Sequence, residues 1–379
     1  MYNIDENINT IFDNHRTLNE DLKYEKEIIE YISKQKTEEK EFTFIVDGKE
    51  KVYKTINWFY LPDEYYNYIL DCVFYKPSFK NVIKEFNKLK NGKKINQEII
   101  ERYYVWDLML NTKFNDKMSI MQRCAYKETL VPILKHLPNP KIAVYKTLKK
   151  NIMGLFRLGA HSKKVSNFPL NEAKAFLKKY NINNMYYDYS CGWGTRLLAS
   201  LSNNINYFGT DPNVELTKRL IKMGNDYKKV TNNKTDFYIY AQGSEIFIPE
   251  LKNKIGVSFS SPPYFKLENY NYKSEFNKNF DDYEYWLNEY WKKTVNNIKE
   301  YLIDGGVFAL NIKSYKTYDL EKDMNEIIND EGFNFLKTEN LKNNTPRPTV
   351  KKEFIDVDEN IYVYTKGKYI KSLDNWFDF

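Results

Sequence analysis

Three short segments of this sequence carry residue types that could do chemistry together. The most unusual is SSPPYF, residues 260–265, in which two serines precede two prolines and two aromatic residues follow them. Proline holds φ near one value and has no N–H, so the loop would present hydroxyl and carbonyl oxygens rigidly as hydrogen-bond acceptors. A proline pair by itself is more typical of a rigid surface turn, so the interpretation depends on the other motifs.

The second segment is a glycine loop, DYSCGWGTR, residues 188–196. Gly192 and Gly194 allow a tight turn and a close approach of the backbone to a ligand. The helix predicted to follow the loop offers free N–H groups and a positive end, which suit an anionic or polar ligand. A plain turn between a strand and a helix is an equally common use of such glycines.

The third segment is GTDPN, residues 209–213, which places Asp211 about twenty residues beyond the glycine loop. An acidic residue at the tip of the second strand is suited to bind the two hydroxyls of a ribose. Asp211 could instead cap the next helix, or serve both purposes. The loop and the acid predict a nucleoside-bearing cofactor. Leu197 stands where a dinucleotide fingerprint would have its third glycine, so a pyrophosphate is a poorer fit.

These segments must be positioned by the elements around them, and from about residue 165 the pattern alternates between strands and helices. Strands are predicted at residues 185–189, 205–209, 236–241, 256–260, 307–312, 334–338 and 360–365. Helices are predicted at residues 171–180, 195–202, 214–227, 283–302 and 319–329. Such alternation is typical of an α/β fold with a mostly parallel sheet covered by helices on both faces. Ligands of such sheets bind at the carboxyl ends of the strands, where the glycine loop and SSPPYF both fall.

Residues 1–150 have a different pattern, mainly helical with one β interruption. A hairpin is predicted from residues 42–46 and 51–56, turning at Asp47-Gly48. Helices are predicted near residues 64–74, 78–89 and 97–110. We therefore expect a mainly helical N-terminal region, residues 1–150, and a catalytic domain, residues 151–379. The N-terminal region could recognise a target, mediate oligomerisation or support the catalytic domain.

The motifs taken in order resemble a known family. Asp188-x-Ser190-x-Gly192-x-Gly194, then Asp211, then Ser261-Pro262-Pro263-Tyr264 is similar to a class I S-adenosylmethionine-dependent methyltransferase, and in particular to the DNA amino-methyltransferases. The sequence differs at Cys191, where that family often has phenylalanine. The resemblance covers about residues 160–366 and implies a Rossmann-like fold with a mostly parallel seven-stranded sheet. Chain size and compact organisation resemble the stand-alone methylases of phages and prophages, which implies a link to DNA modification or restriction-modification.

The resemblance implies roles for individual residues. Ser261, Pro262, Pro263 and Tyr264 would be catalytic. Residues that would bind S-adenosylmethionine are Asp188, Ser190, Gly192, Gly194 and Asp211, with Phe168 on its methionine part and Gln242, Gly243 and Ser244 at its adenine.

The chemistry of the target amine gives this loop a physical reason. An exocyclic amine is a poor nucleophile because its lone pair is delocalised into the base. Acceptors at Ser261 Oγ and the Pro262 carbonyl would favour the pyramidal nitrogen and stabilise the developing charge. Tyr264 would stack on a base rotated out of the duplex. Direct attack on the methyl group needs no covalent intermediate and no metal.

Several alternatives remain open at this point. The target is cytosine N4 or adenine N6, and serine at the first loop position favours cytosine slightly, while the order of the motifs is commoner among adenine enzymes. A methyltransferase of the same fold acting on RNA or a protein amide is one rival, and a non-catalytic nucleic-acid-binding module is another. The recognition sequence, the oligomeric state and the biological purpose are undetermined.

Composition excludes some classes of protein. The 379 residues carry a formal net charge of +7, which is compatible with a nucleic-acid partner. Three scattered cysteines and three histidines make a structural zinc site unexpected. No apolar run approaches the roughly 20 residues of a membrane helix, and the N-terminus is acidic rather than signal-like. We expect a soluble cytoplasmic protein with a DNA partner, no membrane contact and no metal.

Overall fold

The computed structural model describes residues 2–4, 13–114, 117–139, 147–158, 165–270, 282–314, 318–341 and 359–369. The chain divides into two compact units. Unit 1 comprises Met1–Val82, Glu98–Ser166 and Lys266–Asn271, and unit 2 comprises Ile83–Gln97, Asn167–Phe265 and Tyr272–Phe379. The chain therefore passes between the units several times, and the functional division at residue 150 stays a prediction.

A seven-stranded sheet forms the centre of unit 2. Its strands are β5 (Met185–Asp188), β6 (Asn206–Thr210), β7 (Phe237–Tyr240), β8 (Ile255–Ser260), β10 (Leu302–Ile312), β11 (Asn334–Leu341) and β12 (Glu359–Thr365). All seven strands were predicted from sequence to within a few residues, except that β10 begins earlier. β10 extends back because Leu302 still pairs with Ile255 of β8, across an irregularity before Val307.

The order of the strands is β11-β12-β10-β8-β5-β6-β7. The pairs β5–β6, β6–β7, β5–β8 and β8–β10 are parallel, whereas β12 is antiparallel to both of its neighbours. From β5 the chain builds outward through β6 and β7, and then returns to place β8 on the other side of β5. This reversal makes a topological switch point between β5 and β8, where open α/β sheets bind their ligands. The predicted α/β, Rossmann-like fold with a mostly parallel seven-stranded sheet is confirmed.

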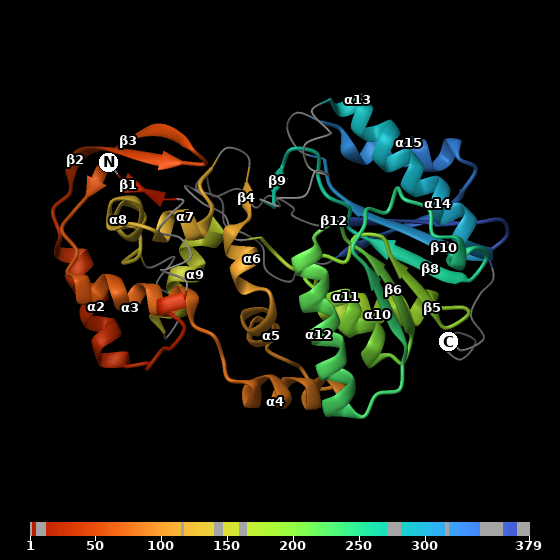
Figure 1. Cartoon of the computed structure of the whole chain (residues 1–379), viewed down its shortest axis with the longest axis horizontal. Coiled ribbons are helices and arrows are strands. Elements are labelled where there is room, and N and C mark those ends of the chain that lie inside the picture. The colour runs from red at the N-terminus through yellow and green to blue at the C-terminus, as the bar shows by residue number, and fades with distance from the viewer. Residues whose placement is uncertain are drawn as a thin grey trace. The chain divides into compact units, whose positions relative to one another are not determined.

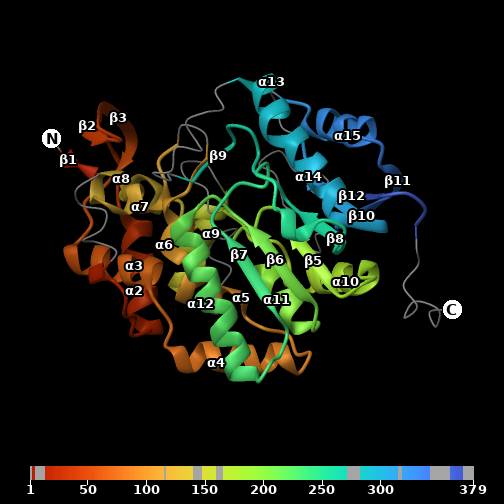
Figure 2. The ribbon, with the colours of Figure 1, turned by 45° about the vertical axis from the view of Figure 1, so that its right-hand side comes forward.

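Helices cover both faces of this sheet (Figures 1 and 2). On one face lie α10 (Leu170–Tyr180), α11 (Thr195–Ser202) and α12 (Val214–Thr231), which pack in sequence against one another. On the other face lie α13 (Tyr283–Trp286), α14 (Lys293–Tyr301) and α15 (Leu320–Asp330). Parallel strands need long crossover connections, and α11, α12 and α14 lie in such connections, which places helices on the faces of the sheet.

The predicted helix at residues 283–302 is continuous but not regular. Its middle, Leu287–Lys292, is a π-helix between α13 and α14. Hydrogen bonds from i to i+5 bring residues five apart, such as Trp286 and Trp291, toward one face of the helix. Both indoles are buried in an aromatic core with Tyr301 and Phe308.

Residues 83–97 add a helical segment to unit 2. They include most of α4 (Phe79–Lys90), and Phe86 is fully buried with its ring 5.3 Å from that of Tyr227 on α12. The Gln97 amide, at the start of α5 (Gln97–Tyr104), donates to Thr195 Oγ1 of α11 at 2.9 Å. A segment of the N-terminal half thus completes the packing of the helices on one face of the sheet.

Unit 1 contains the predicted hairpin, formed by β2 (Glu38–Val46) and β3 (Lys49–Trp58), with β1 (Tyr2–Asn3) beside β2. Asp47 and Gly48 both have positive φ, as a tight hairpin turn requires. Its helices are α2 (Leu22–Lys34), α3 (Asp63–Phe74), the start of α4, most of α5, α6 (Trp106–Asn111), α7 (Ile120–Cys124), α8 (Lys127–Leu134) and α9 (Leu148–Leu158). The single helix predicted over residues 97–110 is divided at Val105, between α5 and α6.

The chain beyond SSPPYF enters unit 1. β9 (Glu268–Asn269) pairs with β4 (Lys113–Phe114), and this two-stranded ladder lies within unit 1. The Tyr270 hydroxyl donates to Glu268 at 2.6 Å. From the sequence, this segment could be a mobile lid on the nucleic-acid side or a solvated loop, and the short ladder gives it a fixed partner. Residues 271–281, which include Tyr272, lie outside the described residues.

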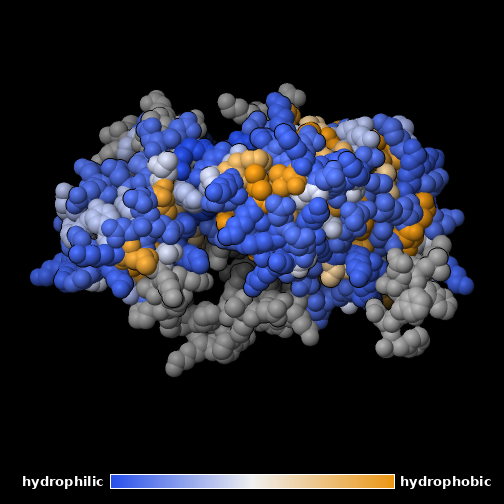
Figure 3. Space-filling model, turned by 90° about the horizontal axis from the view of Figure 1, so that it is seen from below, coloured by the Kyte–Doolittle hydropathy of each residue, from blue (hydrophilic) through white to orange (hydrophobic). Residues whose placement is uncertain are grey.

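The surface in Figure 3 is mainly hydrophilic, with hydrophobic residues gathered in a few patches. Exposed large apolar side chains of unit 2 include Tyr238, Tyr240, Ile246 and Phe247, on and just after the edge strand β7. None of the described helices is long and apolar enough to cross a bilayer.

Candidate active site

The candidate site lies at the carboxyl ends of β8, β5, β6 and β7, which are neighbours in the sheet. The glycine loop follows β5, Asp211 follows β6, the Gln242–Ser244 turn follows β7 and the SPPY loop follows β8. All four sequence motifs therefore emerge at one edge of the sheet. The glycine loop and the SPPY loop occupy the two sides of the switch point.

Gly192 and Gly194 of the glycine loop have φ of +54° and +88°. A Cβ at Gly194 would lie 2.7 Å from Leu220 Cδ2 and 3.0 Å from Met223 Sδ, so this glycine is required by packing of α11 on α12 as well as by its backbone angle. A Cβ at Gly192 would meet nothing nearer than Arg196 Nη2 at 3.5 Å. Gly192 is thus the glycine beside open space, where a ligand could approach.

The start of α11 has no side-chain cap. Gly194 is its N-cap residue and makes no side-chain hydrogen bond, as glycine must, so the first N–H groups of the helix lack the usual capping oxygen. The first turn also contains no acidic residue. Such a helix start is compatible with a bound polar group near the loop.

Asp211 lies directly against the glycine loop. Its carboxylate accepts hydrogen bonds from the N–H groups of Asn213, at 3.0 Å, and of Gly192. Burial raises the pKa of Asp211 to about 7, although these two N–H groups act in the opposite direction. The alternative role as a helix cap is taken by Asn213, whose side chain accepts from the N–H groups of Glu215 and Leu216. Asp211 is therefore available for another role.

A buried arginine ties the glycine loop to the end of β8. Arg196 Nε lies 3.1 Å from both Asp188 carboxylate oxygens, and its Nη2 donates to the Ser190 carbonyl and, at 3.0 Å, to Ser260 Oγ. Burial alone would lower the pKa of Arg196, but the Asp188 carboxylate and nearby groups raise it above its ordinary value. Burial raises the pKa of Asp188, and the Arg196 guanidinium acts in the opposite direction. The Asp188 carboxylate also accepts from Tyr207 OH at 3.0 Å. Asp188 is fully buried and holds Arg196 rather than facing a ligand.

Sequence analysis did not identify Arg196, although one signal was present. A cation in the first turn of a helix opposes the positive end of the helix dipole. An arginine directly after a Gly-x-Gly turn therefore needs a compensating anion nearby, and Asp188 is the acidic residue of the same loop.

The SPPY loop is fastened to the carboxyl end of β10, which pairs with β8. Ser261 is half-buried, and its hydroxyl donates to Asn311 Oδ1 at 2.8 Å. The Tyr264 hydroxyl accepts from the Lys313 N–H at 3.1 Å. Pro262 is buried, while Pro263 and Tyr264 are half-buried. Tyr189 OH lies 3.0 Å from the Ser260 carbonyl, immediately before the loop. The predicted catalytic residues are thus held together, and their catalytic role stays a prediction.

The three residues of the turn after β7 were predicted to contact adenine, and the structure already gives two of their side chains other partners. Ser244 is buried, and its hydroxyl is 2.8 Å from Thr294 Oγ1 of α14, so this hydroxyl serves packing. The Gln242 amide donates to the Ile246 carbonyl at 3.3 Å, within the turn. A Cβ at Gly243 would meet the Glu245 carboxylate at 2.2 Å.

Glu245 is a residue of this turn that sequence analysis passed over. Its Oε2 is buried and has no hydrogen-bond partner, and burial raises its pKa to about 7. Glu245 follows β7 and Asp211 follows β6, so the two carboxylates follow neighbouring strands at the same edge of the sheet.

Phe168 is the last predicted cofactor residue. It is buried, its ring is 5.2 Å from that of Phe259 on β8, and the Arg196 guanidinium lies 6.0 Å from it. The N-cap residue of α10, Pro169, makes no side-chain cap bond. Phe168 therefore packs beside β8 and Arg196, next to the candidate site. His161 and Arg347 lie outside the described residues.

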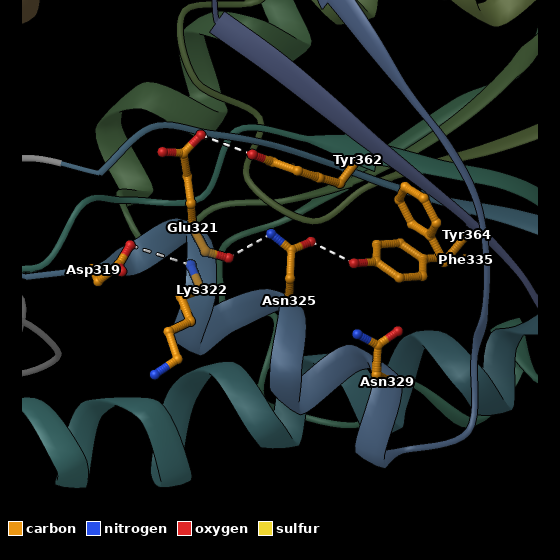
Figure 4. A pocket seen from close by; sticks show the side chains of 8 residues that line it. All are labelled: Asp319, Glu321, Lys322, Asn325, Asn329, Phe335, Tyr362 and Tyr364. Carbon is orange, nitrogen blue, oxygen red and sulfur yellow. Dashed lines mark hydrogen bonds between the residues drawn. The ribbon is translucent and has the colours of Figure 1, made fainter.

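A separate pocket of about 410 Å³ lies between α15 and the β11–β12 hairpin (Figure 4). It is lined by Asp319, Glu321, Lys322, Asn325, Asn329, Phe335, Tyr362 and Tyr364. Tyr362 OH donates to Glu321 at 2.8 Å, and Tyr364 OH donates to Asn325 at 2.5 Å. None of the predicted site residues lines this pocket, so it does not mark the same site. Among the described residues, no group of three or more His, Cys, Asp or Glu side chains could hold a metal ion.

Comparisons with known proteins found likenesses in structure alone. No family model and no curated protein matches the chain. One similar structure is an S-adenosylmethionine-dependent O-methyltransferase from Thermotoga maritima, with 10% identity over 55% of this chain and 69% of that chain and a TM-score of 0.36. A methyltransferase from Pyrococcus furiosus has 16% identity over 54% and 89% of the two chains, with a TM-score of 0.35. A magnesium protoporphyrin IX methyltransferase from Synechocystis, with bound S-adenosylmethionine, has 10% identity over 52% and 78%, with a TM-score of 0.34.

Proposed function

We propose that the chain transfers a methyl group from S-adenosylmethionine to the exocyclic amine of a base in DNA, cytosine N4 or adenine N6. The observation that carries this proposal is the position of the SPPY loop. It follows β8 across the switch point from the glycine loop of β5, and Arg196 joins the ends of both strands. The glycine loop, proposed to bind the cofactor, and the SPPY loop, proposed to bind the amine, therefore lie at one edge of the sheet.

The residues at this edge fit S-adenosylmethionine. The open side of Gly192 and the uncapped start of α11 would approach its amino acid part, and the Asp211 carboxylate would accept from the ribose hydroxyls. Glu245, Gln242 and Gly243 stand after β7, where the adenine would lie. When bound, the cofactor supplies an electrophilic methyl group on a positively charged sulfur.

The chain's own residues would act on the amine. Ser261 Oγ and the Pro262 carbonyl would accept its two N–H groups, so that the lone pair is directed at the methyl carbon. The new N–C bond forms as the C–S bond breaks, and the surplus proton on nitrogen leaves to water. The ring of Tyr264, held through its hydroxyl by Lys313 N–H, would support the flipped base.

DNA is favoured by the first residue of the loop, and a nucleic acid of either kind is favoured over a protein by charge. Serine at the first position matches the cytosine N4 type, which is why we favour cytosine slightly, and the net charge of +7 suits a polyanionic substrate. RNA bases and protein side-chain amides also carry an NH₂ group whose lone pair is delocalised, so they remain the alternative substrates. A target-recognition role for residues 1–150 belongs to the same proposal. So does a place in restriction-modification or phage DNA modification.

The test is transfer of labelled methyl from S-adenosylmethionine to mixed-sequence duplex DNA, RNA and protein in parallel, followed by nucleoside mass spectrometry. N4-methylcytosine or N6-methyladenine in the DNA is expected. Ser261→Ala is the matched control, because it removes the acceptor and leaves the glycine loop intact. Label in RNA or protein would move the activity to that substrate. Failure to bind S-adenosylmethionine in calorimetry would leave the non-catalytic alternative.

A further inference from the structure

The Ser261–Asn311 hydrogen bond has a direction that the structure determines. Asn311 lies on β10, is 2% exposed, and its Nδ2 is 3.1 Å from the Asn360 carbonyl oxygen of β12. A backbone carbonyl can only accept, so the amide nitrogen of Asn311 must face Asn360 and its oxygen must face Ser261. The single hydroxyl hydrogen of Ser261 is therefore directed at Asn311 Oδ1, 2.8 Å away.

This arrangement limits what Ser261 can offer a substrate. A serine hydroxyl has one hydrogen and two acceptor lone pairs, and the hydrogen is already used. Toward any substrate group, Ser261 Oγ is then an acceptor only. Without Asn311 the hydroxyl would rotate, and it could donate its hydrogen to a ring nitrogen or a carbonyl of the base instead.

A buried asparagine is unexpected in β10, a strand whose other residues near its carboxyl end are apolar. Its neighbours Leu310 and Ile312 are fully buried apolar residues, and an amide among them costs free energy unless both of its ends are bonded. Both ends are bonded, one to β12 and one to the catalytic loop. The neighbouring bond from Lys313 N–H to Tyr264 shows that the same strand end holds two residues of the loop.

We propose that Asn311 is a positioning residue that keeps Ser261 an acceptor toward the substrate, and so selects a nucleophile that carries N–H hydrogens. The inference rests on the proposed methyl transfer. It adds a residue outside the SPPY loop and a chemical reason why an exocyclic amine is accepted while an unprotonated ring nitrogen is not.

A double-mutant cycle on turnover tests whether Asn311 acts through Ser261. The variants are Ser261→Ala, Asn311→Ala and the double variant, assayed on whichever of DNA, RNA or protein takes the label. Ser261→Ala should lower kcat about 100-fold. Asn311→Ala should lower it about 10-fold. The double variant should match Ser261→Ala, because Asn311 has nothing left to position. Affinity for S-adenosylmethionine should stay unchanged in all three.

Two further variants separate positioning from general destabilisation. Asn311→Asp keeps an acceptor for the Ser261 hydroxyl and should retain more turnover than Asn311→Ala. Asn325→Ala removes a partly buried side-chain amide that accepts from Tyr364 OH in the pocket of Figure 4, and it should leave kcat unchanged. The same cycle in urea unfolding should show losses that are less than additive, because the two single variants break one shared bond.

The outcomes distinguish the two proposals. Multiplicative losses of kcat in an active enzyme, or additive losses in unfolding, overturn the role of Asn311 and leave the methyl transfer standing. If none of the three substrate classes takes the label, the proposed function fails and the positioning role fails with it. Equal losses of kcat in Asn325→Ala and Asn311→Ala would also overturn the inference, since the effect would then be one of stability.

Discussion

Asp211 is the single residue whose ionisation should be visible in ligand binding. Burial raises its pKa to about 7, and only the carboxylate form can accept from both ribose hydroxyls. We expect the affinity for S-adenosylmethionine to rise about tenfold between about pH 6 and about pH 8, as the carboxylate fraction increases through that pKa. Calorimetry across this range measures the change.

Two variants control this prediction. Asp211→Asn should bind more weakly and lose most of the pH dependence. Glu245 also has a pKa raised to about 7 and lies at the same edge of the sheet, so Glu245→Gln must keep the dependence if Asp211 is its source. A flat profile in the unmodified chain would contradict the assignment.

The same raised pKa has a consequence for stability with the opposite sign. The folded state holds the Asp211 proton up to about pH 7, whereas the unfolded chain loses it near the ordinary value of 3.8. The folded state therefore binds more protons between these values. The Asp211 contribution to the free energy of unfolding falls as the pH rises through this window and is constant above it.

Among the elements, a buried ion pair helps to hold the end of β5 against the end of β8, beside the direct hydrogen bond from Ser260 Oγ to the Ser190 carbonyl at 3.0 Å. Arg196→Met would leave the Asp188 carboxylate buried without its cationic partner, and removing one partner of such a pair costs about 3–5 kcal/mol. We expect a loss of this size in urea unfolding. Affinity for S-adenosylmethionine should fall as well, because the Ser190 carbonyl loses its bond to the arginine.

The double variant Asp188→Asn/Arg196→Met is the informative partner of this experiment. It removes both charges, so it should recover part of the lost stability while the glycine loop stays untethered. Recovery of cofactor affinity together with stability would contradict a direct role of Arg196 in holding the loop.

At the level of the whole molecule, the two units are not successive segments of the chain. Phe86 comes from the N-terminal half and is fully buried on Tyr227 of α12 in unit 2. Phe86→Ala removes this packing and should cost about 3–5 kcal/mol. Hydrogen–deuterium exchange should show faster exchange in α12 and in β6, with β2 and β3 of unit 1 unchanged.

Phe335→Ala is the matched control, because this phenylalanine of unit 2 is 54% exposed and should matter little. If Phe86→Ala instead accelerated exchange in the β2–β3 hairpin and not in α12, residues 83–97 would belong with unit 1 in solution. The result also bears on expression of the predicted catalytic domain, residues 151–379, which would lack this helix.

Local pattern was enough to place most elements of the sheet and its helices. Short apolar runs indicated the strands, and Asp47-Gly48 indicated the hairpin turn, because both signals act between residues close in sequence. The SPPY and glycine loops were located in the same way, as unusual residue types directly after predicted strands. The break at Val105 and the π-helix at Leu287–Lys292 were missed, since both depend on packing rather than on local periodicity.

The partners of these loops came only from the three-dimensional arrangement. Arg196 meets Ser260, and Asn311 meets Ser261, because the strand order places β8 between β5 and β10. No pattern of local sequence specifies that order, since parallel strands are paired across long connections by the burial of whole faces. Residue type and spacing therefore determined which loops could do chemistry, and the pairing of distant strands determined which side chains hold those loops in place.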